Sequence, residues 1–309
     1  MASLTGQDFL SMADLSATHV HQLLDLAAAM KAGDVEPRCN KVLGLLFNKA
    51  STRTRVSFSV AIYQLGGHVL DLNSNVTQVK RGEPTQDTAR VLDRYLDIVA
   101  IRTFEQGELE TFANYAKIPV INALTDLEHP CQVLADLQTV KETFGRLDGL
   151  TLVYLGDGNN VAHSLMLGCA LVGINITVAT PADFQPDPQI VKRAQQLAGD
   201  RTQVSVSQDP QAAVKGAHVL YTDVWASMGQ EDSASSRIPI FQPYQLNETL
   251  MSLADPSAIA LHCLPAHRGE EITNGVMEGS QSKIWDQAEN RLHAQKALLA
   301  SLLGAVEQS

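Results

Sequence analysis

Hydroxyl and guanidinium side chains are concentrated in the stretch Ser-Thr-Arg-Thr-Arg at residues 51–55. An apolar run typical of a buried strand precedes it at residues 42–47, and apolar residues recur at helical spacing from Phe58 to Leu65. The first turn of a helix offers unpaired backbone N–H groups and the positive end of the helix dipole, to which arginine adds forked donors. A Ser or Thr cap beside solvated arginines is the simpler alternative. Two arginines beyond a strand favour a phosphate site, because open α/β sheets bind ligands there.

Arg102, His129 and Gln132 also stand beyond strand-like runs. Arg102 ends the apolar run 97–102, and a His-Pro-Cys-Gln motif with His129 and Gln132 at its ends follows the run 118–123. A neutral His and a Gln amide can donate hydrogen bonds to a carbonyl oxygen without adding a strong base. The alternative is that both residues cap the helical stretch that follows, which would make them structural.

Asp223 and Cys263 occupy corresponding positions in the second half of the chain. Asp223 closes the apolar run 217–223, and Cys263 lies in the run 258–264. An isolated Asp at such a position is usually a turn or helix cap, and a buried free Cys is usually a small hydrophobic residue. A substrate ammonium group would give Asp223 a better partner, since a carboxylate pairs strongly with a cation in a water-poor site.

The segment Gly-Asp-Gly-Asn-Asn at residues 156–160 follows another strand-like run and could suggest dinucleotide binding. It lacks the third glycine that lets a helix pack closely in dinucleotide-binding folds, and an isolated fingerprint is a weak signal. An Asn-rich turn that caps the next helix is a competing interpretation. His262 and His267 near Cys263 could suggest metal binding, but the sequence supplies no second ligand cluster for them, so no metal is expected.

Short apolar runs alternate with longer stretches of helical period, which predicts βαβ units on parallel sheets. The runs are 42–47, 68–72, 97–102, 118–123, 150–156, 174–180, 202–207, 217–223 and 258–264. They fall into two groups, with a connecting helix expected within 133–149, where Gly145 and Gly149 are its expected stop, and a terminal helix at 291–306. The sequence therefore predicts two doubly wound parallel-sheet α/β domains joined by helices and divided near residue 146, with the active site in the cleft between them.

The composition is that of an ordinary globular protein. The 309 residues carry a formal net charge of −11, which disfavours a polyanion-binding surface, so nucleic acid is not an expected partner. The four cysteines are far apart and include no CxxC pair, which suits a reducing cytoplasm better than a disulfide framework. Neither a secretory leader nor a membrane-spanning apolar run is expected.

Four motifs together resemble the aspartate and ornithine carbamoyltransferase superfamily. Ser-Thr-Arg-Thr-Arg resembles its carbamoyl-phosphate loop, and His-Pro-Cys-Gln resembles its H-P-x-Q motif. Asp-Val-Trp-Ala-Ser-Met-Gly at 223–229 and His-Cys-Leu-Pro at 262–265 resemble the segments that distinguish the ornithine members from the aspartate members. Glu-Asn-Arg-Leu-His at 289–293 resembles a further family segment. The motifs occur in family order over most of the chain.

The resemblance implies a role for each matching residue. The expected carbamoyl-phosphate ligands are Ser51, Thr52, Arg53, Thr54, Gln78, Arg102, His129, Gln132, Cys263, Leu264 and Arg291. The expected ornithine ligands are Asn160, Asp223, Ser227 and Met228. Catalytic roles are expected for Arg102, His129, Asp223 and Cys263, with Cys263 not acting as a covalent nucleophile. Residues 1–146 with the C-terminal helix 288–309 would bind carbamoyl phosphate, and residues 147–287 would bind ornithine.

The implied reaction transfers the carbamoyl group of carbamoyl phosphate to the δ-amine of L-ornithine and gives L-citrulline and phosphate, as in arginine biosynthesis. The donor is already activated and the substrate amine is the nucleophile, so no cofactor is expected. The loop around Gln78 is expected to reach a neighbouring subunit's site, which implies a homotrimer. Lys80 and Pro84 depart from the commoner Gly and Ser of the family. Lys80 could add a phosphate contact or be solvated surface charge, and the second interpretation is favoured.

Three alternatives remain open. A different amine acceptor, such as putrescine or an acylated ornithine, would keep the phosphate motifs but change the contacts to the α-carboxylate and α-ammonium groups. A nicotinamide-dependent oxidoreductase is disfavoured by the incomplete glycine fingerprint, and a non-catalytic binding protein is disfavoured by the intact arginine and histidine motifs. The same residues serve arginine synthesis and citrulline breakdown, so they do not decide between these directions.

Overall fold

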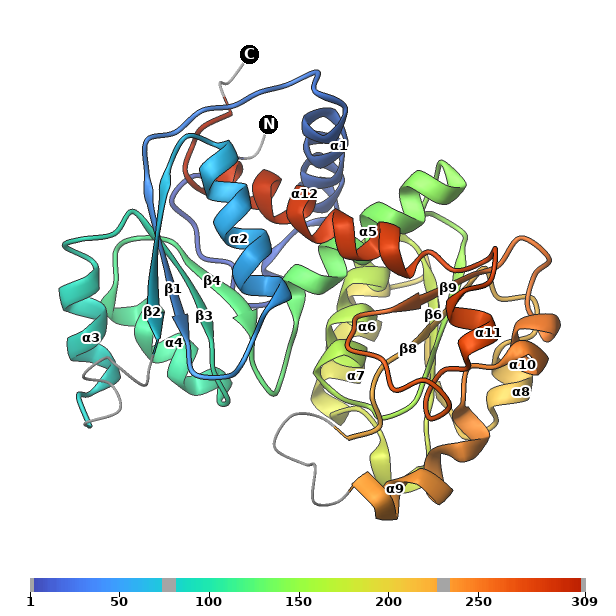
Figure 1. Ribbon diagram of the computed structural model, residues 1–309. Helices are drawn as coiled ribbons and strands as arrows, with labels where there is room; N and C mark the ends of the chain where they lie inside the picture. Colours follow the sequence, from blue (N-terminus) through green and yellow to red (C-terminus); the bar gives the residue numbers. More distant parts are fainter. Residues whose placement is uncertain (1–2, 74–81, 227–233, 307–309) are drawn as a thin grey trace. The chain divides into compact units, whose positions relative to one another are not determined.

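The computed structural model describes residues 3–73, 82–226 and 234–306. The chain divides into two compact units (Figure 1). Unit 1 comprises Met1–Gln138 and Asn290–Ser309, and unit 2 comprises Thr139–Glu289. The chain therefore passes between the units twice, once inside helix α5 (Pro130–Phe144) and once inside helix α12 (Ile284–Leu302).

Unit 1 contains a four-stranded parallel sheet with the strand order β2-β1-β3-β4. Its strands are β1 (Val42–Phe47), β2 (His68–Asn73), β3 (Ile98–Arg102) and β4 (Val120–Leu124). Its helices, besides parts of α5 and α12, are a short 3-10 turn η1 (Met12–Asp14), α1 (Ala17–Ala32), α2 (Arg53–Gln64), α3 (Thr85–Leu92) and α4 (Gln106–Tyr115). Strands β3 and β4 are buried along their whole length, as expected for apolar strands of a parallel sheet covered on both faces.

Unit 2 contains a five-stranded parallel sheet with the strand order β7-β6-β5-β8-β9. Its strands are β5 (Thr151–Leu155), β6 (Asn175–Ala179), β7 (Val204–Ser207), β8 (Val219–Thr222) and β9 (Ile259–His262). Its helices are α6 (Asn160–Val172), η4 (Ala182–Phe184), α7 (Pro188–Ala198), α8 (Pro210–Ala213), α9 (Ala234–Phe241), η6 (Gln242–Tyr244), α10 (Glu248–Leu253) and α11 (Asn274–Met277).

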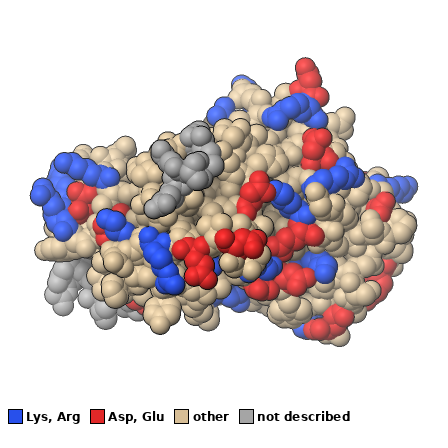
Figure 2. All heavy atoms as spheres, turned by 90° about the horizontal axis from the view of Figure 1, so that it is seen from above, with Lys and Arg blue, Asp and Glu red and all other residues tan. Residues whose placement is uncertain are grey.

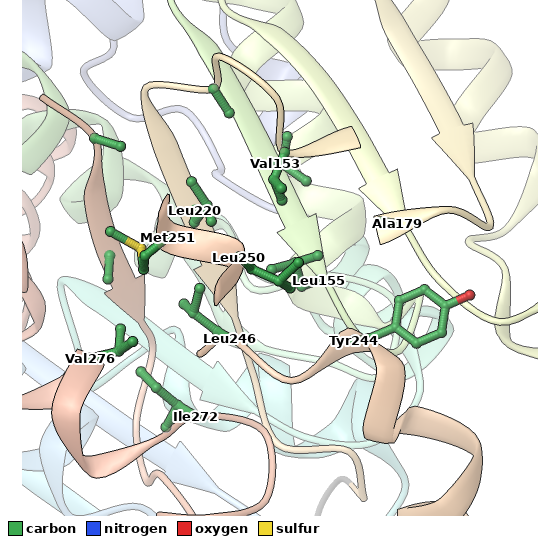
Figure 3. Close-up of a cluster of buried hydrophobic side chains, with 14 of the residues drawn as sticks. Val153, Leu155, Ala179, Leu220, Tyr244, Leu246, Leu250, Met251, Ile272 and Val276 are labelled. Atoms are coloured by element: carbon green, nitrogen blue, oxygen red, sulfur yellow. The ribbon is translucent and has the colours of Figure 1, made fainter. Parts of the chain in front are cut away.

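Each unit has its own hydrophobic core. In unit 1, Val99 and Ile101 of β3 pack with Leu109 and Phe112 of α4. Figure 3 shows part of the larger cluster of unit 2, in which side chains of β5 and β8 meet those of the segment from η6 to α11. Burial of this apolar surface is the main favourable contribution to the folding of each unit. The two cores hold the strand ends, from which the functional loops emerge, in fixed positions.

The prediction of two parallel-sheet α/β units is confirmed, and every predicted strand run overlaps a strand. The connecting helix begins at Pro130, before the predicted 133, and ends at Phe144, where Gly145 adopts a left-handed φ of 70°. The terminal helix begins at Ile284 instead of 291. Helix ends are less certain than helix cores in a sequence pattern, because several residues near each end satisfy the same period.

The surface carries charges of both signs. On the face in Figure 2, the described Lys and Arg side chains are interspersed with Asp and Glu. This face therefore presents mixed charge where a nucleic-acid site would need clustered positive charge. Among the described helices, none combines the length and the hydropathy needed to cross a membrane.

Candidate active site

The first half of the candidate site lies at the carboxyl ends of the unit 1 strands. The strand order of this sheet reverses between β1 and β3, the position at which open α/β sheets bind ligands. Phe47 and Arg102 are register partners across these strands, and the Asn48 N–H donates to the Arg102 carbonyl at 2.8 Å. The Thr103 N–H donates to the carbonyl of Leu124 at the end of β4 (3.0 Å). The loops after β1, β3 and β4 therefore meet at one edge of the sheet.

Helix α2 begins inside the Ser-Thr-Arg-Thr-Arg stretch, as predicted. Thr52 is the N-cap residue but makes no capping hydrogen bond through its side chain, which leaves the first N–H groups of the helix open to a ligand. Arg53 is the first helical residue and is exposed. Arg55 instead contacts Asp71 of β2 and lies over the Phe47 ring, 5.1 Å from its centroid. The structure thus gives the two arginines different surroundings: Arg53 is exposed, whereas Arg55 is partly buried and paired with Asp71.

A buried chain of hydrogen bonds connects α12 to this half-site. Arg291 Nη2 donates to Thr54 Oγ1 at 3.0 Å, and Arg291 Nη1 donates to Gln132 Oε1 at 2.6 Å. Gln132 Nε2 donates in turn to Asp136 Oδ1 at 2.8 Å. All four side chains are almost completely buried. The structure therefore brings together Thr54, Gln132 and Arg291, which lie far apart in the sequence.

His129 is buried beside three arginines. Desolvation by burial, followed by the positive charges of Arg291, Arg102 and Arg53, holds the pKa of His129 well below its ordinary value. The imidazole is therefore neutral near pH 7 and is a weak base. A neutral imidazole can still donate one hydrogen bond to a carbonyl oxygen. This half-site thus combines positive charge for an anion with a neutral donor for a polarised carbonyl.

The second half of the candidate site lies at the corresponding switch point of unit 2, between β5 and β8. Thr222 of β8 is the register partner of Leu155 in β5 and of His262 in β9, so the residues that follow these strands are neighbours. Gly158 packs so closely against the chain that a Cβ would lie 2.3 Å from the backbone nitrogen of Pro186. Close packing against the backbone therefore explains why residue 158 is a glycine, and the glycine is no evidence for a dinucleotide site.

Asn159 links the glycine-containing segment to Asp223. Its Oδ1 accepts from the N–H groups of Val161 (2.9 Å) and Ala162 (3.2 Å), which caps α6, and also accepts from the Tyr154 hydroxyl at 3.2 Å. Its Nδ2 donates to Asp223 Oδ2 at 2.9 Å. The cap predicted for this turn is therefore present, and the same side chain orients the carboxylate.

Asp223 and Cys263 are in direct contact. The Cys263 thiol donates to Asp223 Oδ1 at 2.9 Å, and the Val224 N–H donates to the same oxygen at 2.8 Å. Burial raises the pKa of the nearby Tyr154 hydroxyl, and the negative charge of Asp223 adds to this effect. A carboxylate that is 6% exposed and surrounded by neutral donors is a suitable partner for a substrate ammonium group.

Two other predicted residues directly follow members of this network in the chain. Asn160 is the first residue of α6 and is partly buried. Leu264 follows Cys263 and is partly buried, with a left-handed φ of 59°. Both Leu264 and Cys263 belong to unit 2, whereas the other described residues expected to bind carbamoyl phosphate belong to unit 1.

Two groups of side chains in the described residues could hold a metal ion. Potential ligand atoms of Asp223, His262 and Cys263 lie within 4.8 Å of one another. The sequence pattern gives no indication that Asp223 completes this group. Both ring nitrogens of His262 are engaged in hydrogen bonds, which makes it a poor ligand in this arrangement. The second group, His267, Glu270 and Glu271, is partly exposed.

Several predictions fall on residues that the structure does not describe. Gln78, Lys80, Ser227 and Met228 lie in the segments 74–81 and 227–233. Neither the contact of Asn159 with Asp223 nor the place of Tyr154 beside it was predicted from the sequence. An Asn directly before a helix signals a cap, but no sequence pattern indicates that its amide nitrogen reaches a strand end 64 positions further along the chain.

The fold and the two half-sites define a class of protein: a two-unit α/β chain with a helix N-terminus and arginines at the end of one sheet and a carboxylate–thiol pair at the end of the other. Residues 7–142 match the family described as aspartate/ornithine carbamoyltransferase, carbamoyl-P binding domain, and residues 148–302 match its Asp/Orn binding domain. The chain belongs to the aspartate/ornithine carbamoyltransferase family.

Full-length relatives support this assignment. The chain is 70% identical over 305 residues to an ornithine carbamoyltransferase of Nostoc punctiforme, with 99% of this chain and 100% of the relative covered. Among solved structures, an ornithine carbamoyltransferase from Gloeobacter violaceus is 58% identical with a TM-score of 0.89 and coverages of 97% and 99%. One from Pyrococcus furiosus is 47% identical with a TM-score of 0.94 and coverages of 99% and 100%.

Proposed function

We propose that the protein transfers the carbamoyl group of carbamoyl phosphate to the δ-amine of L-ornithine and releases L-citrulline and phosphate. The observation that carries this proposal is the Asp223–Cys263–Asn159 arrangement at the switch point of unit 2, which provides a carboxylate for an amino-acid ammonium group. Relatives at 66–70% identity that are named ornithine carbamoyltransferases support ornithine as the acceptor.

The unit 1 half-site would hold carbamoyl phosphate. The uncapped N-terminus of α2 with Ser51, Thr52 and Arg53 would bind the phosphate, which leaves as a dianion. Arg102 and neutral His129 would donate hydrogen bonds to the carbonyl oxygen, where negative charge develops during attack. Because Gln132 already accepts from Arg291 and donates to Asp136, its contribution would be to orient Arg291.

The unit 2 half-site would hold ornithine. Asp223 would pair with an ammonium group, and Asn159 would keep the carboxylate oriented, with Asn160 close by. The δ-amine must lose its proton before attack, since an alkylammonium titrates near pH ~10. The δ-ammonium would give up this proton to water, and the hydrogen-bonded pair of Asp223 and Cys263 would align the resulting amine on the carbonyl carbon. The proton that the nitrogen loses after attack would leave on the departing phosphate, as the bond between the carbonyl carbon and the phosphate oxygen breaks.

We assign the two substrates to the same residue ranges as the sequence prediction does. We propose that residues 1–146 with 288–309 bind carbamoyl phosphate and that residues 147–287 bind ornithine. The two compact units change over inside α5 and α12, and Arg291 of α12 is bonded to Thr54 within unit 1. Gln78, Ser227 and Met228 would add contacts to the two ligands, in line with the family resemblance of their motifs.

A comparison of acceptors tests the proposed function. Purified protein is supplied with carbamoyl phosphate and with ornithine, putrescine, N-acetylornithine or aspartate, and the carbamoylated product is measured. We expect kcat/KM for ornithine to exceed the others by at least about 100-fold, because an acceptor without the matching ammonium group leaves buried polar groups unpaired. Faster use of putrescine or acetylornithine would identify the alternative acceptor and refute the ornithine assignment.

We further propose that the protein works as a homotrimer in the cytoplasm, in arginine biosynthesis. Val56 and Tyr63 lie seven positions apart on α2 and, with Leu70 of the edge strand β2, are 55%, 77% and 48% exposed. Large apolar side chains on adjoining elements favour a protein interface. The four cysteines are free thiols, which suits a reducing compartment. Light scattering of the wild type and of Tyr63→Glu tests the assembly, and a monomeric wild type would contradict it.

A further inference from the structure

His262 and Glu271 mark the two ends of the loop that carries Cys263 and Leu264. His262 is the last residue of β9, and its ring Nε2 lies 2.9 Å from Glu271 Oε1. Both side chains are fully buried. The first and last residues of the loop are therefore joined to each other inside the protein.

Each of these two side chains also binds a backbone N–H group of the loop between them. His262 Nδ1 accepts from the N–H of Leu264 at 2.8 Å. Glu271 Oε1 accepts from the N–H of His267 at 2.6 Å. The chain of contacts thus runs from Leu264 through His262 and Glu271 to His267, and it closes the loop on itself.

The contacts determine the protonation of the His262 ring. A backbone N–H can only donate, so Nδ1 of His262 must be unprotonated to accept from Leu264. The ring proton of the neutral imidazole is therefore on Nε2, from which it donates to Glu271 Oε1. An imidazolium would place a second proton on Nδ1 and break the contact to Leu264. The pair thus works as a hydrogen-bond relay of defined direction.

The backbone held by this relay is in an uncommon conformation. In the described part of the chain, Leu264 is the one non-glycine residue with a positive φ, 59°. This region is unfavourable for residues with a branched side chain and persists only where surrounding contacts hold it. The bond from the Leu264 N–H to His262 supplies such a contact directly next to Cys263, whose thiol bonds Asp223.

We propose that His262 and Glu271 are a positioning pair for the reaction, which fixes the backbone of Cys263 and Leu264 and thereby the place of the Cys263 thiol beside Asp223. This inference rests on the proposed function for its kinetic consequence. Neither residue of the pair needs to touch a substrate. Loss of the relay releases Leu264 toward negative φ and moves the thiol away from Asp223.

Two near-isosteric substitutions of Glu271 test the pair. Glu271→Gln keeps an oxygen that accepts from both His262 Nε2 and the His267 N–H, whereas Glu271→Leu removes the acceptor at similar volume. We expect kcat/KM for ornithine to fall about 10- to 100-fold in Glu271→Leu, because displacement of a positioned group by about 1 Å costs up to about 100-fold. Glu271→Gln should restore the value to within about threefold of the wild type. Glu270→Leu, one residue away and outside the relay, is the matched control.

The alkylation rate of Cys263 is a second measurement that does not depend on turnover. Iodoacetamide labelling with mass-spectrometric readout follows each of the four cysteines separately. Cys39 is partly exposed like Cys263, and Cys131 and Cys169 are buried, so they report general loosening. We expect Glu271→Leu to change the rate of Cys263 by about tenfold or more while the other three rates stay unchanged. His262→Phe, which keeps a ring without nitrogens, should act in the same way.

The outcomes distinguish failure of the proposed positioning role of His262 and Glu271 from failure of the proposed function. If the kinetics and the Cys263 labelling are unchanged in folded Glu271→Leu and His262→Phe, the proposed positioning role of the pair is refuted. Equal acceleration at all four cysteines would also overturn it, since the effect would then be general destabilisation. Affinity for inorganic phosphate, measured by calorimetry, should be unaffected in every variant, because the phosphate ligands belong to unit 1. A wild type that forms no citrulline would refute the proposed function, while the labelling would still decide on the pair.

Discussion

Asn159 has two separable tasks, and substitution by Ser or Ala distinguishes them. Its Oδ1 caps α6, and its Nδ2 donates to Asp223 at 2.9 Å. Asn159→Ser retains a hydroxyl that can cap the helix but is too short to reach the carboxylate. Asn159→Ala removes both contacts. The difference in stability between the two variants therefore measures the cap, and the losses of stability and of ornithine kinetics that they share measure the contact with Asp223.

The expected magnitudes follow from the contacts. Loss of an N-cap side chain costs about 1 kcal/mol of the free energy of unfolding. Loss of a donor to a buried carboxylate costs a further ~1.5–3 kcal/mol. Asn159→Ala should therefore destabilise unit 2 by about 3 kcal/mol and Asn159→Ser by about 2 kcal/mol. Both variants should lower kcat/KM for ornithine to a similar degree, by about 10- to 100-fold, because both leave Asp223 without its orienting donor.

The assay can be confined to the relevant unit. The chain has two tryptophans, and both Trp225 and Trp285 belong to unit 2, so tryptophan fluorescence during urea unfolding reports that unit. Ornithine kinetics are measured by citrulline formation at saturating carbamoyl phosphate. If Asn159→Ser recovers wild-type kinetics together with stability, the contact to Asp223 has no functional role and the reasoning is refuted.

Three further predictions concern single residues of the two half-sites. Arg53→Ala should lower kcat by about 100- to 1000-fold in a citrulline assay, whereas Arg55→Ala, whose side chain is occupied by Asp71, should stay within about tenfold; equal losses would contradict the separation of the two arginines. The folded pKa of His129 is depressed and its unfolded pKa is near ~6.5, so unfolding takes up a proton and stability falls as the pH drops below ~6.5 toward the folded pKa. His129→Gln should flatten the pH dependence of the free energy of unfolding in that window by up to about 1.4 kcal/mol per pH unit, and an unchanged slope would show that His129 is not held neutral. Cys263→Ser should retain measurable citrulline formation, since no covalent intermediate is expected; loss of more than about 10⁴-fold in a folded variant would point to a nucleophilic cysteine instead.

Much of the first half-site could be predicted because its signals are local. An apolar run, a turn and a helix that starts with Ser-Thr-Arg-Thr-Arg lie within one short segment, and the structure has β1 and α2 there. Parallel strands place their carboxyl ends at one edge, so Arg102 and His129 could be expected beside that segment. The different surroundings of Arg53 and Arg55 could not be predicted, because the contact of Arg55 with Asp71 depends on how β2 lies beside α2.

The sequence by itself determined the alternation of strands and helices, and with it the sheet type and the residues that follow each strand, because these depend on period and local chain chemistry. The tertiary structure decided which distant side chains meet: Arg291 with Thr54, Asn159 with Asp223, and the two ends of the loop after β9. Such contacts depend on strand order and on the packing of α12, and they join residues between nine and 237 positions apart. No local pattern encodes a hydrogen bond whose partner is supplied by another element, and only the folded chain brings the two atoms within reach.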